Sequence, residues 1–287
     1  MSDNVYVIGT DMIRFGRFED ATPPSLAAKA ALMALDDAGL SIKDIEAVYS
    51  GNCGETMVGQ RMLQLIGQTG VPVVNVTNAC AAGGTACREA WIAIKVGVCD
   101  VALAVGSEKM GKGMLVRKNR AGEAIPSEGL VGSGTMPAVF AEMGMEHARA
   151  YGTTPEQFAQ VSVKNHFHST LNPKAMYQRE TPLDEVMGSE MIAYPNTKLM
   201  CSVNVDGSAA AVLCSERKLK QLGLTSRAVR VRASALASDP FTDRNLVMPD
   251  VSTVTRLAAE SAYEAAGVGP QDLDLVELHD CFATAEI

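Results

Sequence analysis

Short apolar runs alternate with longer alanine- and leucine-rich segments along the first 105 residues of the chain. The apolar runs predict four strands, at residues 5–8, 45–50, 71–77 and 101–105. The segments between them predict three helices, at residues 25–38, 59–69 and 81–97, with Ser25 as the first cap and Gly39 as the first stop. Because the strands are apolar on both faces, we expect a parallel-rich sheet with helices on each side, which is an α/β fold.

The regular pattern stops after Gly106 and returns near residue 200. The sequence between them is rich in glycine, methionine and charged residues, with short helical pieces such as Pro155 to Asn165, and we interpret it as an inserted segment. Beyond it, the pattern predicts a helix from Ser252 to Ala266 that stops at Gly267. Three more strands are predicted, at residues 207–214, 229–231 and 273–278.

An internal repeat relates the two ends of the chain. A shift of 228 positions places Ala30, Ala31, Ala34, Ala38, Gly39, Asp44, Val48 and Cys53 on Ala258, Ala259, Ala262, Ala266, Gly267, Asp272, Val276 and Cys281. Helix, glycine cap, acidic turn and strand recur in the same order, which predicts two related halves. The first half continues well past Cys53, whereas the sequence ends six residues after Cys281, so we expect the second half to be incomplete.

Charge and cysteine usage exclude several classes of function. The net charge of −8 and the pI near 5.1 offer no basic face to nucleic acid.

The sequence has neither the Gly-x-Ser-x-Gly elbow of hydrolases nor a dinucleotide-binding Gly-x-Gly-x-x-Gly after its first strand. It also shows no signal-peptide pattern and no run of about 18 apolar residues, so we expect a cytoplasmic protein without a membrane partner. Seven scattered cysteines without a Cys-x-x-Cys pair argue against a disulfide framework and against a metal site.

Cys80 is the candidate nucleophile of the sequence. It lies where the apolar run 71–77 ends and an alanine-rich helix begins. The amino-terminal end of a helix lowers the pKa of a cysteine thiol and favours the thiolate, which is the attacking form. Gly83 and Gly84 are expected to leave open space beside the sulfur for a thin acyl carrier. An isolated cysteine is more often a small buried residue, but the strand, the helix start and the glycine pair together favour a nucleophile.

Four further segments, taken in order with Cys80, resemble the thiolase superfamily. They are Gly106–Gly113, Lys164–Ser169 followed by Asn172-Pro173, Asp206–Ala211 and His279–Phe282. More narrowly, the chain is similar to the sterol-carrier-protein-type thiolases and their bacterial and archaeal relatives. The resemblance implies a thiolase-like duplicated αβαβα layered fold. It also implies an amino-terminal half at residues 1–110 and 200–222, an inserted loop domain at 111–199 and an incomplete carboxy-terminal half at 223–287.

The resemblance implies acyl transfer in two steps through an acyl group on Cys80. The reaction would cleave a 3-oxoacyl-CoA with free CoA, or run in reverse as a Claisen condensation, with coenzyme A as substrate and no covalently bound cofactor. Each step passes through a tetrahedral oxyanion, which needs fixed hydrogen-bond donors. The family pattern places one such donor at His279; the alternative for this residue is a solvent-exposed histidine at the end of a strand.

Basic side chains at the start of the inserted segment could hold the phosphates of coenzyme A. They include Lys109, Lys112 and Arg117, and a solvated loop is the competing interpretation. By resemblance, Ser202 lies close to the pantetheine arm. His166 and His168 are two positions apart and therefore point in different directions, so a structural or channel-lining role is expected rather than a shared metal.

The chain departs from the thiolase pattern in two loops. Thiolases carry a Gly-His-Pro loop, whose histidine activates the nucleophilic cysteine, and a Cys-x-Gly loop, whose cysteine acts as acid and base at the α-carbon of the substrate. Neither loop occurs in these 287 residues. We therefore expect either a fragment of a longer protein or a shortened subunit that a partner completes. A small zinc-ribbon and OB-fold protein is the partner that the resemblance suggests.

Two other functions stay open at this stage. One is a thiolase-like aldolase acting on a side-chain CoA ester, against which the cysteine nucleophile argues. The other is a non-catalytic subunit that binds acyl-CoA within a heteromeric complex. By resemblance we also expect a homodimer or higher oligomer in which residues 71–77 form the interface, so that a charge at Val74 should dissociate or unfold the assembly.

Overall fold

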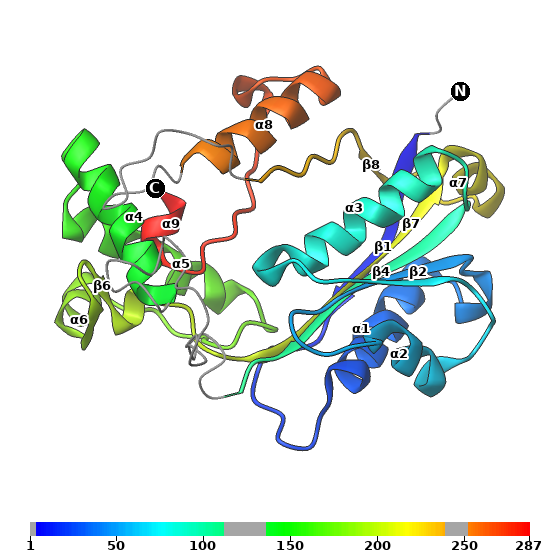
Figure 1. The fold of residues 1–287 in the computed structure, drawn as a ribbon, viewed down its shortest axis with the longest axis horizontal. Helices are drawn as coiled ribbons and strands as arrows, with labels where there is room; N and C mark the ends of the chain where they lie inside the picture. The colour runs from blue at the N-terminus through cyan, green and yellow to red at the C-terminus, as the bar shows by residue number, and fades with distance from the viewer. Residues whose placement is uncertain (1–3, 112–135, 239–251) are drawn as a thin grey trace, which may run out of the picture. The chain divides into compact units, whose positions relative to one another are not determined.

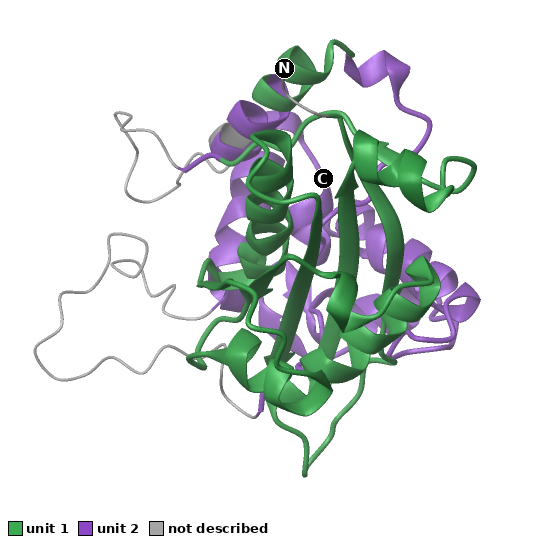
Figure 2. Cartoon of the chain, turned by 90° about the vertical axis from the view of Figure 1, so that its right-hand side faces the viewer, with its two compact units in different colours: residues 1–109, 205–236, 261–268 green, residues 110–204, 237–260, 269–287 purple. Residues whose placement is uncertain are grey.

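The computed structural model describes residues 4–111, 136–238 and 252–287. The chain divides into two compact units (Figure 2). Unit 1 comprises residues 1–109, 205–236 and 261–268, and unit 2 comprises residues 110–204, 237–260 and 269–287. These units group residues of this one chain, and the domain limits expected from the sequence stay a prediction. Lys112 and Arg117 lie outside the described residues.

Unit 1 is built on a six-stranded sheet with the order β3-β2-β4-β7-β1-β8 (Figure 1). Its strands are β1 (Val5–Met12), β2 (Ala47–Gly51), β3 (Val73–Val76), β4 (Val101–Lys109), β7 (Asp206–Ser215) and β8 (Val229–Val231). Strand β2 pairs parallel with β3 and β4, whereas β7 pairs antiparallel with β4 and β1, and β8 antiparallel with β1. The α/β class is thus confirmed, but the expectation of a parallel-rich sheet is wrong. Continuous apolar runs are typical of parallel strands, but an antiparallel strand that is buried on both faces, as β7 is here, shows the same pattern.

Helices cover both faces of this sheet (Figure 1). The helices of unit 1 include α1 (Pro23–Ala38), α2 (Val58–Ile66), α3 (Ala82–Lys95) and α7 (Glu216–Leu222). Along β4, Leu103 and Val105 pack in the core formed with α1 and α2, while Ala102 and Ala104 pack in the core formed with α3. Because successive side chains of a strand point to opposite faces, β4 separates two cores and is buried on both sides.

The ends of α1 follow from local sequence signals. Thr22, not Ser25, is the N-cap; its side chain accepts from the backbone N–H of Ser25, whose hydroxyl accepts in return from the N–H of Thr22. This reciprocal pair forms a capping box and satisfies donors that the first helical turn leaves open. At the other end, Gly39 takes a left-handed conformation with φ of 68°, as expected for a C-cap.

The internal repeat is visible in local structure. Helix α8 (Ser252–Ala266) ends at Gly267 with φ of 64°, which matches α1 and Gly39. Each helix is followed by a single 3₁₀ turn, Ile42–Asp44 in one copy and Pro270–Asp272 in the other. In both turns an aspartate side chain accepts from a backbone N–H three residues earlier at 2.8 Å.

The two copies differ after this turn. Residues 47–50 of the segment 45–50 belong to β2, whereas residues 273–278 form no strand in the structure and are exposed along their whole length. The predicted strand at 273–278 is therefore wrong for this chain. A strand exists only where a neighbouring backbone accepts and donates its hydrogen bonds, and none of the described strands pairs with this segment.

Unit 2 is mainly helical. Its elements include α4 (Met136–Tyr151), α5 (Pro155–Leu171), α6 (Leu183–Gly188), the hairpin of β5 (Met191–Ala193) and β6 (Asn196–Thr197), the 3₁₀ turn η4 (Lys198–Met200) and α9 (Ala283–Glu286). Phe158, Val186, Met200 and Ala283 form the centre of its core. Helix α5 is longer than the piece expected at Pro155–Asn165. Within the described residues, none of the helices has both the length and the apolar character needed to cross a membrane.

Candidate functional site

Cys80 lies at the junction that the sequence predicts. Strand β3 ends at Val76, a short 3₁₀ turn η2 covers Ala79–Ala81, and α3 begins at Ala82. Cys80 is the cysteine classed as exposed, while the other six are partly or fully buried. Cys80 therefore lies between a strand and a helix, as the sequence predicts, and the positive end of the α3 dipole points toward it.

The backbone before Cys80 is held in an unusual conformation. Ala79 has a positive φ of 42°, a region that costs a residue with a side chain about 1–2 kcal/mol. The turn is fixed on both sides, because the N–H of Ala81 donates to the carbonyl of Asn78 at 2.9 Å and the Asn78 side chain donates to Thr85 at 2.9 Å. The surrounding contacts therefore determine how Cys80 is presented.

Glycines bring the start of α3 against the sheet. A methyl group on Gly51 would lie 2.3 Å from the carbonyl oxygen of Ala82, and one on Gly106 would lie 3.1 Å from the Cα of Gly83. The helix start thus rests on the backbone at the ends of β2 and β4. Gly84 has open space where a side chain would be. A methyl group on Gly83 would lie 3.6 Å from the Cα of Gly106, an ordinary contact, so close packing requires neither glycine of the pair.

A hydrogen-bond network from Glu108 fixes the loop after β2. One carboxylate oxygen of Glu108 accepts from the N–H of Cys53 at 2.8 Å, and the other accepts from the Asn52 side chain at 3.3 Å. The same amide of Asn52 donates to the carbonyl of Ser107 at 2.7 Å, and Asn52 is buried. Because β4 carries Glu108, the loop after β2 is tied to β4 at the same end of the sheet as Cys80.

Cys53 extends this network to the nucleophile loop, a contact that the sequence analysis missed. Its thiol donates to the carbonyl oxygen of Ala79 at 2.9 Å, next to Cys80. Burial raises the pKa of Cys53 to about 11, and the Glu108 carboxylate and Cys80 act in the same direction. Cys53 therefore keeps its proton at neutral pH. The internal repeat could have indicated Cys53 as a site residue, because Cys53 matches Cys281, which lies two residues after His279.

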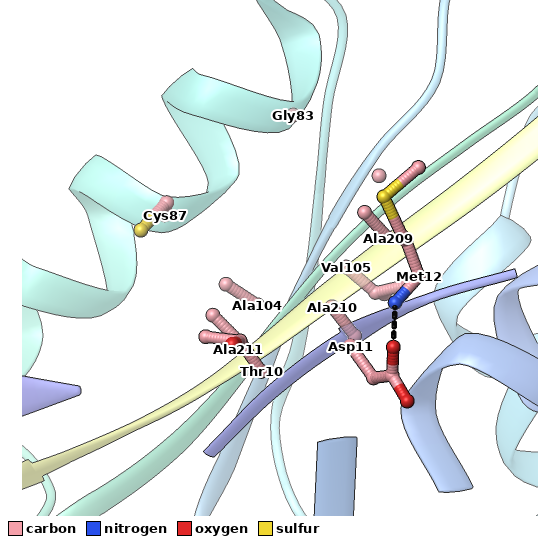
Figure 3. A pocket seen from close by; sticks show the side chains of 11 residues that line it. Thr10, Asp11, Met12, Gly83, Cys87, Ala104, Val105, Ala209, Ala210 and Ala211 are labelled. Carbon is pink, nitrogen blue, oxygen red and sulfur yellow. Dashed lines mark hydrogen bonds between the residues drawn. The ribbon is translucent and has the colours of Figure 1, made fainter. Parts of the chain in front are cut away.

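A pocket of about 500 Å³ opens between α3 and the sheet (Figure 3). Gly83 and Cys87 line it from α3, and small residues such as Ala104 and Ala211 line it from the strands below. Burial raises the pKa of the Cys87 thiol, so this group stays neutral. Cys80 is not among the lining residues, and the pocket is therefore not the space around the candidate nucleophile.

The candidate phosphate-binding lysine lies at the end of β4. The ammonium group of Lys109 donates to the backbone carbonyls of Glu19 at 2.6 Å and Ala21 at 2.8 Å. It therefore holds the segment before α1 and uses two of its three donors there. Lys112 and Arg117, which were grouped with it, fall in the part of the chain that is not described.

The remaining candidates, His279 and Ser202, belong to unit 2. His279 is exposed in the extended segment that leads into α9. Ser202 lies next to that segment, because its N–H donates to the carbonyl of Cys281 at 2.9 Å. Two motif segments also meet here, since the side chain of Asn165 donates to that of Asp280. His279 and Ser202 are thus in adjacent segments of one unit, whereas Cys80 and Lys109 are in the other.

Buried contacts anchor the segment that carries His279. Phe282 is buried and stacks on Phe140 with ring centroids 4.7 Å apart. The hydroxyl of Thr284 donates to the carbonyl of Phe140 at 2.8 Å, and a methyl group on Gly144 would lie 2.4 Å from this threonine. The residues after His279 are therefore fixed against α4, which holds the histidine at a defined position within unit 2.

The paired histidines of α5 have separate environments. The ring of His166 contacts the hydroxyl of Thr181 at 2.6 Å and stacks on Tyr177, and burial lowers its pKa. His168 is exposed. Over the described ranges, no three His, Cys, Asp or Glu side chains form a group able to hold a metal ion.

Comparison with known proteins places these features in a family. Residues 5–191 match the model of the thiolase N-terminal domain. Sterol carrier protein 2 of Gallus gallus is 37% identical over 302 residues, covering 100% of this chain and 55% of that protein. Acetyl-CoA acetyltransferase of Methanothermobacter thermautotrophicus is 35% identical over 297 residues, covering 98% of this chain and 74% of that protein.

A solved structure shares the fold. The Ltp2-ChsH2(DUF35) aldolase superposes with a TM-score of 0.80 at 22% identity, over 99% of this chain and 75% of that chain. The chain spans about half the length of the sterol carrier proteins that it matches. The thiolase-like fold expected from the sequence is confirmed, and the chain belongs to the thiolase family.

Proposed function

We propose that this chain carries the acyl-accepting thiol of a thiolase-type acyltransferase that acts on 3-oxoacyl-CoA and coenzyme A. The observation that carries the proposal is the exposed Cys80 immediately before α3 in a member of the thiolase family. Other members of this family named above include an acetyl-CoA acetyltransferase, whose name states acyl transfer from a CoA thioester.

The proposed reaction has two steps. In the first, the thiolate of Cys80 attacks the 3-oxo carbonyl carbon, the bond between C2 and C3 breaks, and C2 takes up a proton to give acetyl-CoA. In the second, the thiolate of coenzyme A attacks the acyl-Cys80 thioester, releasing a shortened acyl-CoA and the Cys80 thiolate. Proton transfer at C2 needs a further acid and base, for which the family uses a Cys-x-Gly loop that this sequence does not contain.

Two features of the chain would stabilise charge in these steps. The positive end of the α3 dipole favours the attacking thiolate of Cys80. We assign to His279 one hydrogen bond to the oxyanion, a type of contact whose removal costs about a hundred- to a thousandfold in rate. The buried anchors at Phe282 and Thr284 support this role, since a donor must be held in place before the charge develops.

We further propose that Lys109, Lys112, Arg117 and Ser202 contact coenzyme A, and that the protein assembles through β3. The three basic residues would pair with phosphate oxygens, and Ser202 would contact the pantetheine arm. Strand β3 is at the edge of the described sheet, where one row of its backbone groups could pair with a second copy. A second subunit of zinc-ribbon and OB-fold type remains the proposed heteromeric partner.

Mass spectrometry tests the acyl transfer directly. The protein is incubated with acetyl-CoA or a 3-oxoacyl-CoA, quenched in acid and mapped for covalent acyl groups. We expect one acyl group on Cys80, none on the Cys80→Ala variant, and an undiminished adduct on the matched Cys87→Ser variant, because Cys87 lies on α3, the helix that follows Cys80. Binding of acyl-CoA without any adduct on Cys80 would overturn the proposal and favour a binding subunit or an aldolase.

A further inference from the structure

The loops that carry Cys53 and Cys80 are brought together by the sheet. Strands β2 and β3 are parallel neighbours, with Gly51 opposite Val76, and the N–H of Asn52 donates to the carbonyl of Val76 at 3.2 Å. The residues that follow each strand therefore leave the same edge of the sheet side by side. This register places the backbone of the loop after β2 beside the nucleophile loop.

The contact between the two loops is direct. The sulfur of Cys53 lies 2.9 Å from the carbonyl oxygen of Ala79, whose peptide unit continues into Cys80. A disulfide needs Cα atoms within about 7 Å of each other and sulfurs about 2.05 Å apart. To reach that geometry, the Cys53 sulfur must move from the Ala79 carbonyl oxygen to the sulfur of Cys80, the next residue in the chain. That change concerns the exposed turn at residues 77–81 and leaves the paired strands in place.

We propose that Cys53 and Cys80 form a reversible disulfide when a hydroperoxide oxidises the protein, so that Cys53 is the resolving thiol of the nucleophile. The Cys80 thiolate attacks one oxygen of hydrogen peroxide, the O–O bond breaks, and the products are a sulfenic acid and water after protonation. The Cys53 sulfur then attacks the sulfenic sulfur, the S–O bond breaks, and the Cys53 proton leaves with the hydroxyl as water. Two thiols and one peroxide thus give one disulfide and two waters.

The environment of each thiol assigns its role. Cys80 is exposed and lies before a helix, so peroxide reaches it first. Cys53 is partly buried and neutral, which protects it from peroxide, and its attack on the sulfenic acid is intramolecular. Intracellular disulfides of this kind are usually transient and redox-sensing. Formation of the disulfide needs no acyl transfer; only the loss of activity that it would cause rests on the proposed function.

The other cysteines are less suited to this reaction. Cys87 follows Cys80 by seven residues, which is about 10 Å along a helix and beyond disulfide reach. Cys99 and Cys214 are buried in the cores of unit 1. Cys201 and Cys281 are a separate neighbouring pair in unit 2, since Cys201 bridges to Phe282 across two antiparallel segments. The test must therefore identify which cysteines are joined.

Peptide mapping makes that identification. Cys53 lies in the tryptic peptide 44–61 and Cys80 shares the peptide 62–88 with Cys87, so the protein used is the Cys87→Ser variant. After a brief treatment with hydrogen peroxide, we expect peptides 44–61 and 62–88 to be joined with the loss of two hydrogens and to separate in dithiothreitol. A Cys281→Ser change in the same background removes the other pair and should leave this linkage unchanged.

A second variant, Cys53→Ser, tests the role of Cys53 as the resolving thiol. Cys53→Ser retains a hydrogen-bond donor toward Ala79, and without a resolving thiol its Cys80 should proceed to the sulfinic acid, with two added oxygens. Sulfinic acid on Cys80 in the presence of Cys53, without the linkage, would overturn the inference. The linkage in a protein that never accepts an acyl group would instead reject the proposed function and leave the disulfide standing.

Discussion

The accessibility of Cys80 depends on a few single residues around it. Ala79 holds a positive φ, and the backbone of α3 approaches Gly51 and Gly106 more closely than side chains would permit. Interiors are packed so tightly that one added methyl group must displace its neighbours. The position of the nucleophile is therefore set by residues that have no chemistry of their own.

Two glycine-to-alanine changes separate packing from helix propensity at this site. In Gly51→Ala the new methyl group would lie 2.3 Å from the Ala82 oxygen, so we expect the free energy of unfolding to fall by about 1–3 kcal/mol and iodoacetamide to react with Cys80 at a different rate. Gly84→Ala is the control, because the site is open and helical, and should stabilise by about 0.5–1 kcal/mol. Urea unfolding measures both; equal effects would contradict the close approach.

Strands β4 and β7 form the centre of unit 1. They pair along their length, from Val101 opposite Cys214 to Lys109 opposite Asp206, and the sheet separates two cores. Burial of polar groups in such a strand changes their chemistry. Cys214 is fully buried, and burial raises the pKa of its thiol from 9.0 to about 12, with the Asp100 carboxylate acting in the same direction. The strand therefore tolerates this residue only as the neutral thiol.

The stability of the protein at alkaline pH tests whether Cys214 must stay neutral in the folded state. Because the pKa of Cys214 is higher in the folded state than in the unfolded state, its contribution to stability is complete below about pH 9 and is lost as the pH rises toward 12. We expect the free energy of unfolding to fall above about pH 9, and to fall less steeply in Cys214→Ala, although that variant starts from a lower value. Cys80→Ala is the control and should keep the steep decline. Parallel curves for all three proteins in urea unfolding would contradict the assignment.

At the scale of the whole molecule, the sheet of unit 1 ends in an exposed edge. Among the strands that the structure describes, β3 pairs with β2 alone, and Val74 on β3 is 43% exposed. An edge strand with apolar side chains is a template for pairing with another chain. Strand β3 immediately precedes the turn with Cys80. An assembly through β3 would therefore bring two candidate nucleophiles, one from each copy, near one interface.

A charge on this edge tests the assembly. Val74→Asp places a carboxylate on a side chain that is already exposed, so we expect the protomer to keep its circular dichroism spectrum while the sedimentation coefficient falls to that of a monomer. Leu65→Asp is the matched control, since Leu65 is also apolar and exposed but lies on α2. Its sedimentation should equal that of the unchanged protein. An unchanged coefficient for Val74→Asp would exclude β3 as the interface.

Much of the local structure could be read directly from the residues. The pattern predicted β1 to β4, α1 to α3 and the glycine caps, because periodicity and capping depend on neighbours in the chain. The repeat found by shifting the sequence reappears in the two caps and the two acidic turns. Ser25 was assigned to the wrong position of the capping box, since Thr22 and Ser25 offer the same chemistry three residues apart.

The sequence by itself therefore determined the α/β class, the duplicated helix and turn, and the position of Cys80 between a strand and a helix. Only the tertiary structure decided the antiparallel course of β7, the absence of a strand at 273–278 and the contact of Cys53 with the nucleophile loop. The reason is physical: caps and periodic patterns involve residues a few positions apart, whereas strand pairing and thiol contacts join residues that lie tens to more than a hundred positions apart. Such pairings depend on which backbones and side chains come into contact in the folded chain, and a local sequence pattern does not predict those contacts.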